Sequence, residues 1–429
     1  MAQLKNYYFN LFHHDVEPIV KGNSIWSLQS EYVIDYEHFG YTNWISEDDV
    51  LQTVVPNGED VAMHIITDNT VALDTDVVAH SVEIGEAATL NVTDDHSMRI
   101  GDSLVLNGLL SVTNSRSLSN ASAETALQMT GTGTINLSAN GYSGYLGTQE
   151  NRNAFVIGKD LTVTTFGWSS GYIYANIANA GTITTEAGEL SLKGNTIENT
   201  GAIVTGGRNI YLEDATVNGA GVLNGVNGDI QLYGVTVNNG ALTGTVKING
   251  DNPSTLNQIT VDENGVLSIQ AHTIAQGSLA IEGKVNVWNN RSLTNASTEA
   301  ALQLTGTGTM NLSDNGYSGS LGTEAVRNAF VIGKDLTVTT NGWSSGYIYA
   351  NLTNSGIITT QAGELTLKGN TIENAGMIVT GGRNIYLEDA TVNGGALNGT
   401  NGEIQLYGVT VNNGALTGTV KVNRSEEHV

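Results

Sequence analysis

Apolar and polar residues alternate along most of this chain in short runs of three to five positions. Alternation over so few positions predicts short β-strands with one buried face. Gly and Asn stand at the ends of the runs, where the chain must turn with positive φ. In residues 188–244 the runs recur every twenty residues, so that LSL (190–192) returns as IYL (210–212) and IQL (230–232). This period predicts a repeat architecture built from short strands.

A twenty-residue unit is too small to bury its own inward face, but stacked copies of it share a common core. We predict three columns of stacked inward side chains: Leu190, Ile210 and Ile230; Leu192, Leu212 and Leu232; and Ile197, Val217 and Val237. Asn218 and Asn238 are expected to form a ladder of side-chain amides at a turn. The predicted fold class is therefore all-β, a right-handed parallel β-helix, which is a solenoid of roughly 20-residue coils with an N-terminal capping region.

A longer repeat, a tandem duplication, contains the short ones. Residues 116–218 match residues 291–393 at 84 of 103 positions. We therefore predict three parts of the chain: an N-terminal cap or anchor region at 1–77, a first repeat at 78–254 and a second repeat at 255–429.

The N-terminal region differs in composition from the repeats, because residues 1–44 hold 10 of the 27 aromatic residues. The open end of a β-helix exposes unpaired backbone, which invites aggregation unless it is covered. We interpret this region as a compact cap over the first coil. The alternative is an anchoring or export domain.

The repeats resemble a known group of proteins. Phrases such as NAGTITTEAGELSLKGNTIENTGAIVTGG (179–207) are similar to the β-helical coils of filamentous haemagglutinin-type and autotransporter passenger adhesins. In those families a short N-x-G-x-I strand precedes a G-x-L-x-L strand and a hydrophobic-x-N turn. The similarity covers residues 176–246 and 351–422. It implies a parallel β-helix and a role as a surface adhesin.

The charge balance narrows the choice of partners. Asp and Glu number 42 against 17 Lys and Arg, a formal charge of −25. A nucleic-acid partner is not expected, because such binding needs a basic face. We also expect no membrane insertion, since no stretch approaches the ~18–20 apolar residues of a span. The N-terminus lacks the pattern of a secretory signal peptide, so an extracellular or cell-surface location would need an export route that the sequence leaves open.

Aromatic residues gather in the segments that interrupt the regular coils. The phrases NGYSG (140–144, 315–319) and GWSSGYIYAN (167–176, 342–351) occur once in each repeat. Aromatic faces beside Ser and Asn suit uncharged glycans, because the rings stack on sugar faces and the polar groups bond the hydroxyls. The predicted ligand-binding residues are Tyr142, Trp168, Tyr172, Tyr174, Tyr317, Trp343, Tyr347 and Tyr349. The alternative is that these aromatics pack over the flank of the solenoid.

Metal binding and catalysis have weaker support. The segment HHDVE (13–17), together with His38, offers metal ligands without the spacing of a dedicated zinc site. The acidic pairs at 48–49 and 94–95 leave calcium open, although no calcium-roll repeat is present. We expect no cofactor, no disulfide, since the chain has no Cys, and no enzyme activity. Charged residues of the regular coils, such as Arg208 and Glu213 or Arg383 and Glu388, stand singly rather than as the paired carboxylates of a glycosidase.

These features predict a non-enzymatic extracellular β-helical adhesin or matrix-fibre structural protein. Its expected partners are cell-surface or extracellular glycans or matrix, contacted through the aromatic loops, and other copies of the chain joined end to end as a filament. The alternative is a phage tail-spike-like protein that binds or cleaves polysaccharide.

Overall fold

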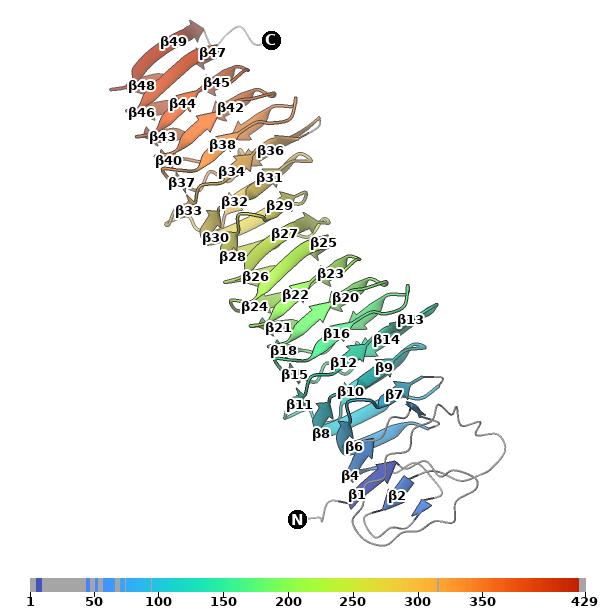
Figure 1. The fold of residues 1–429 in the computed structure, drawn as a ribbon. Coiled ribbons are helices and arrows are strands. Elements are labelled where there is room, and N and C mark those ends of the chain that lie inside the picture. The colour runs from blue at the N-terminus through green and yellow to red at the C-terminus, as the bar shows by residue number, and fades with distance from the viewer. Residues whose placement is uncertain are drawn as a thin grey trace. The chain divides into compact units, whose positions relative to one another are not determined.

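The computed structural model describes residues 5–9, 44–46, 51–52, 57–65, 70–73, 75–93, 95–314 and 316–423. In these residues every regular element is a β-strand, from β1 (Lys5–Phe9) to β49 (Ala415–Asn423) (Figure 1). The chain forms two compact units, unit 1 (residues 1–211) and unit 2 (residues 212–429). Within each unit, short strands about twenty residues apart pair in parallel. The predicted all-β parallel solenoid is confirmed.

In unit 1, three consecutive turns show how the coils are held together. Strand β15 (Phe155–Ile157) pairs with β18 (Ile177–Asn179), which pairs with β21 (Thr196–Asn199). The register places Phe155, Ile177 and Ile197 directly over one another, each at most 3% exposed. Because every coil covers the apolar face of the one before it, the core is continuous along these turns.

In unit 2 the same arrangement recurs through β42 (Leu365–Lys368), β45 (Ile385–Glu388) and β47 (Ala396–Tyr407). Their register stacks Leu367, Leu387 and Leu406. These positions correspond to the predicted column of Leu192, Leu212 and Leu232, whose members are each 0% exposed. The sequence pattern therefore identified the inward face correctly.

The predicted amide ladder at the turn is also present, beside part of the third predicted column. Val217 and Val237 are register partners in β24 (Thr216–Asn218) and β26 (Thr236–Asn238). The Asn238 side-chain amide donates to the Asn218 side-chain oxygen at 2.8 Å, and Asn412 donates to Asn393 at 2.9 Å. Stacked amides of this kind satisfy polar groups along the axis of the coils.

Glycine is favoured where the backbone turns with positive φ beside another side chain. Gly194 and Gly369 adopt φ of +61° and +60°. A Cβ at Gly369 would lie 2.5 Å from an Arg327 guanidinium nitrogen, so a side chain here would be strained by the positive φ and would displace the guanidinium.

The predicted N-terminal cap and most of the candidate metal ligands lie near the start of the chain. The backbone of β1 runs parallel to β4 (Gly58–Ile65) and antiparallel to β2 (Trp44–Ser46). Most of the predicted cap lies outside the described residues, as do HHDVE, His38, the 48–49 pair and Asp94. The cap and the repeat boundaries therefore stay predictions. The described ranges contain no group of three or more His, Cys, Asp or Glu placed to hold a metal ion.

Candidate functional site

Each repeat carries a small antiparallel hairpin that interrupts the parallel coils. It consists of β13 (Ser138–Ala139) with β14 (Tyr142–Leu146) in the first repeat, and β35 (Ser313–Asp314) with β36 (Tyr317–Leu321) in the second (Figure 1). The sequence predicted these interruptions, because the loops break the twenty-residue period.

Buried polar side chains join each hairpin to the neighbouring tryptophan loop. The Asn136 side-chain oxygen accepts from the backbone N–H groups of Ser138 at 3.2 Å and Phe166 at 2.8 Å. The Ser138 hydroxyl donates to the Gly167 carbonyl at 3.0 Å. In the second repeat Asn311 and Ser313 take the same roles. Satisfied buried bonds of this kind fix the position of both loops.

The four aromatic residues at the loop tips are exposed to solvent. Trp168 is 67% exposed and Trp343 is 73% exposed. Tyr142 and Tyr317 are exposed by 54% and 45%. A Cβ at Gly316 would lie 2.7 Å from the Trp343 ring, so this indole lies close against the tip of the hairpin and presents its remaining surface to water.

Trp288 supports the hairpin of the second repeat. Its ring meets Tyr317 edge to face at 5.8 Å between centroids, and its indole N–H donates to the Ser268 hydroxyl at 2.8 Å. Thr113 occupies the corresponding position in the first repeat. The hairpin of the second repeat therefore has an aromatic contact that the first repeat lacks, a difference that sequence reasoning missed.

The remaining predicted tyrosines lie on the sheet, beside the loops. In the first repeat Tyr172 and Tyr174 stack on Tyr145 at 5.4 and 6.0 Å between centroids. Arg152 lies over Tyr174 at 5.9 Å and Lys193 over Tyr172 at 5.7 Å. Tyr174 is only 9% exposed. These contacts match the packing alternative for Tyr172 and Tyr174.

The same region of the second repeat borders a pocket. The rings of Tyr347 and Tyr349 are nearly parallel, with 5.9 Å between centroids and 7° between planes, and Arg327 lies over Tyr349 at 6.0 Å. Ser320 stands where the first repeat has Tyr145. A pocket of about 300 Å³ lies here. Burial raises the pKa of Tyr349, and the nearby Glu324 carboxylate raises it further, so the phenol stays protonated at neutral pH.

An arginine fastens the loop that borders each tyrosine pair. Arg152 donates to the carbonyls of Lys193, at 2.7 Å, and Gly194. Arg327 donates to those of Lys368 at 2.6 Å and Gly369 at 2.7 Å. Each arginine thus ties the loop to a turn 41 to 42 residues later in the chain. A recurring Arg in the loop was visible in the sequence, but its partners were not.

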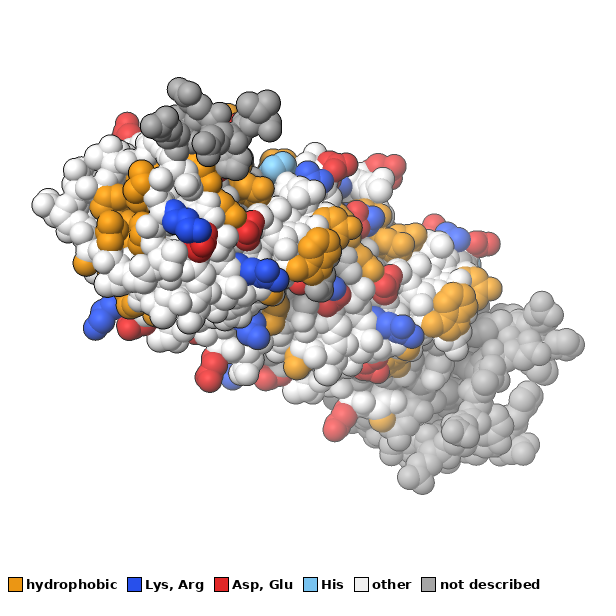
Figure 2. Space-filling model, turned by 90° about the horizontal axis from the view of Figure 1, so that it is seen from above, with side chains coloured by type: hydrophobic (Ala, Val, Ile, Leu, Met, Phe, Trp, Pro, Cys, Tyr) orange, Lys and Arg blue, Asp and Glu red, His pale blue; other side chains and the backbone are white. Residues whose placement is uncertain are grey.

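Charged groups are dispersed over the face of the molecule that Figure 2 presents. Figure 2 shows small acidic and basic groups separated by uncharged and hydrophobic areas. The singly placed Arg208 and Arg383 donate to backbone carbonyls of the preceding turn, each at 3.1 Å. Glu388 lies 3.5 Å from Lys368. These charges form local contacts.

Comparison with known proteins identifies no family for this chain. No family model and no curated protein matches this chain. Among solved structures, a fragment of TibA whose hyper-glycosylation was catalysed by TibC is 13% identical to this chain. The alignment covers 84% of this chain and 99% of the TibA fragment, with a TM-score of 0.20. The Streptococcus pneumoniae surface protein and adhesin PfbA is 10% identical, with coverages of 85% and 90% and a TM-score of 0.17. Likenesses this low do not bear on the chain's function.

Among the described residues, no helix is long and apolar enough to cross a membrane.

Proposed function

We propose that this chain is a non-enzymatic adhesin or matrix-fibre protein of the extracellular or cell surface, which binds uncharged glycans through its aromatic loops. One observation carries the proposal. Trp168 and Trp343, at corresponding places in the two repeats, are 67% and 73% exposed although their loops are fixed by buried hydrogen bonds. Large aromatic side chains held in water in this way are typical of contact surfaces.

The surroundings of the tryptophans favour sugars over other ligands. Both loops have the sequence GWSSG, so each indole is followed by two hydroxyl side chains and no charged residue. A formal charge of −25 opposes polyanionic partners. Since the loops are already fixed, a ligand that binds them would lose little affinity to ordering them.

The proposal is tested by replacing both tryptophans with Ala and probing a glycan array. Wild-type protein should bind at least one neutral glycan, and the Trp168→Ala, Trp343→Ala variant should lose that binding while its thermal unfolding is unchanged. Val226→Thr is the matched control, because Val226 is 59% exposed and Thr400 stands at the corresponding position of the second repeat. Undiminished binding by the double variant would refute the role of the loops.

The state of assembly is a separate part of the proposal. End-to-end self-association remains a prediction, as does the tail-spike-like alternative, which implies a trimer. Sedimentation velocity over a concentration series separates a monomer, a trimer and an end-to-end filament. A monomer at all concentrations would contradict filament formation, and a stable trimer with capsule-degrading activity would favour the alternative.

A further inference from the structure

The two repeats differ at one position that decides whether a space is open or filled. Tyr145 pairs with Tyr172 across β14 and β17 (Gly171–Ile173), and its ring stacks on Tyr172 and Tyr174. Ser320 pairs with Tyr347 across β36 and β39 (Gly346–Ile348) in the same register. The change from Tyr to Ser removes an entire ring from the outer face of the sheet, next to two tyrosines that both repeats keep.

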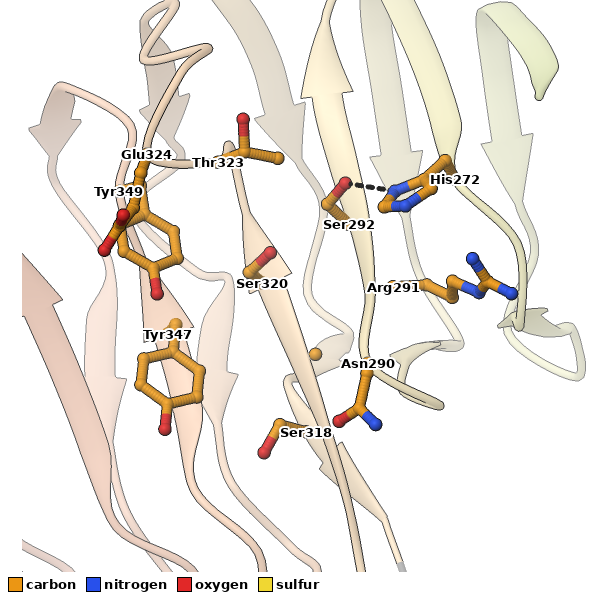
Figure 3. Close-up of a pocket in the computed structure, with 11 residues that line it drawn as sticks. His272, Asn290, Arg291, Ser292, Ser318, Ser320, Thr323, Glu324, Tyr347 and Tyr349 are labelled. Atoms are coloured by element: carbon orange, nitrogen blue, oxygen red, sulfur yellow. Dashed lines mark hydrogen bonds between the residues drawn. The ribbon is translucent and has the colours of Figure 1, made fainter. Parts of the chain in front are cut away.

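The space left beside Ser320 is the pocket of about 300 Å³. Figure 3 shows Tyr347 and Tyr349 on one side, His272 and Ser292 on the other, and Ser320 between them. Small-molecule sites occupy roughly 300–1,000 Å³, so this pocket suits a ligand the size of one sugar ring. Its aromatic wall is the pair of nearly parallel tyrosines.

The polar groups of the pocket suit hydroxyl groups. The Ser292 hydroxyl is 2.8 Å from His272 Nδ1, and Ser320 donates to the Gly322 carbonyl at 2.9 Å, which leaves its oxygen able to accept. The Thr323 oxygen accepts from the Val326 N–H at 2.9 Å, which leaves its proton able to donate. A polyol satisfies such a mixture, because each of its hydroxyls both donates and accepts.

Charged side chains of both signs line the pocket. Glu324 lies beside Tyr349, with the Lys368 ammonium 4.0 Å from its carboxylate, and Arg291 lines the pocket as well (Figure 3). An uncharged ligand avoids repulsion from either sign, and the Glu324 carboxylate can accept from a sugar hydroxyl. The first repeat has the neutral Gln149 in place of Glu324.

We propose that this pocket binds one uncharged pyranose ring, stacked on Tyr347 and Tyr349, and that Tyr145 fills the corresponding place in the first repeat. This inference rests on the proposed glycan-binding function and assigns it a specific site, separate from the tryptophan loops.

Ser320→Tyr is the decisive variant, because it copies the residue and the stacking that the first repeat already contains. The probes are the methyl glycosides of glucose, galactose, mannose and N-acetylglucosamine, measured by saturation-transfer NMR titration on the full chain. At least one should bind wild-type protein, and Ser320→Tyr should weaken that binding tenfold or more without lowering the thermal midpoint. Val226→Thr should bind as wild type does.

Glu324→Gln tests the choice of a neutral sugar and likewise copies the first repeat. Wild-type protein should bind the neutral glycosides more tightly than methyl glucuronide, and the variant should reduce this preference. Tighter binding of the glucuronide by wild-type protein would overturn the assignment of a neutral ligand.

Failure of the pocket and failure of the broader proposal give different results. If Ser320→Tyr binds as tightly as wild type while the double tryptophan variant loses glycan binding, the pocket assignment is wrong and the loop proposal stands. If no glycan binds wild-type protein on the array or in the titrations, both are wrong. Loss in Ser320→Tyr with retention in Val226→Thr supports the pocket.

Discussion

The stacked interior makes neighbouring residues of one strand respond very differently to the same substitution. In β44 (Met377–Val379), Ile378 is 0% exposed and lies in register between Ile358 and Leu397, whereas Met377 is 41% exposed. Replacing Ile378 with Asp should unfold several coils of unit 2. Replacing Met377 with Asp should have little effect. The two variants have the same change in charge and differ in position by a single residue.

The magnitude follows from two terms. Removing a buried Ile side chain costs about 2–5 kcal/mol. An aspartate with no partner in this interior must take up a proton, which at pH 7 costs about 4 kcal/mol for an ordinary pKa of about 3.9. The sum, roughly 6–9 kcal/mol, is comparable to the whole stability of a typical domain. An exposed substitution such as Met377→Asp should cost about 1 kcal/mol or less.

The pH dependence gives a second test of the buried carboxyl. Because burial raises the folded-state pKa of the introduced Asp, Ile378→Asp should be least unstable below the unfolded pKa. It should lose about 1.4 kcal/mol per pH unit as the pH rises from about 4 towards the raised folded value.

Hydrogen exchange measured by mass spectrometry locates the damage. Since each coil of a solenoid depends on its neighbours, Ile378→Asp should remove protection from β44, from β41 (Ile357–Thr359) and from β47. Met377→Asp should preserve it. Equal protection in the two variants would refute the inward placement of Ile378 and the register on which it rests.

Three further predictions concern single contacts. Arg327→Met should lower stability by about 1–3 kcal/mol in thermal unfolding, because it removes the bonds to the carbonyls of Lys368 and Gly369; an unchanged midpoint would contradict the clamp. The Thr307 hydroxyl, and then its N–H, hold the pKa of Glu282 below its ordinary value. The Glu282 carboxylate should therefore contribute to stability above the pKa that it has in the unfolded chain. This contribution should be lost as the pH falls through its lower pKa in the folded chain. Side-chain NMR titration checks this, and Thr307→Val, which removes the hydroxyl, should raise that pKa. Gly319→Ala should cost more than 2 kcal/mol in chemical denaturation, because its Cβ would lie 1.8 Å from the Val287 carbonyl oxygen; a neutral effect would show that the hairpin is placed wrongly.

The sequence predicted the regular coils because their physics is local and periodic. A twenty-residue period alone places Val217 beside Val237 and Asn218 beside Asn238, as the register and the amide bond confirm. Each inward position repeats the chemistry of the one before it, so alternation and period suffice to assign the core.

The loop geometry could not be predicted in the same way. The stacking of Tyr145 on Tyr172 joins residues 27 positions apart, across an interruption of the period. The bonds from Arg327 span 41 to 42 residues. One signal of the pocket was available in the sequence: the second repeat has Ser320 where the otherwise similar first repeat has Tyr145. Without the neighbouring rings in place, that difference does not indicate an open pocket.

The central claim is that successive coils stack in register along each unit, and a distance between two spin labels tests it most directly. The chain has no Cys, so labels can be attached at Lys284→Cys and Ala415→Cys alone. These exposed positions in unit 2 are joined by six register pairings through Thr309, Thr337, Ile357, Met377 and Ala396. At about 4.8 Å per step, the backbone separation should be about 29 Å. Pulsed electron–electron double resonance should give one narrow distribution of label-to-label distances near this value, allowing for the label tethers. A broad distribution, or a maximum beyond about 45 Å, would contradict the in-register solenoid.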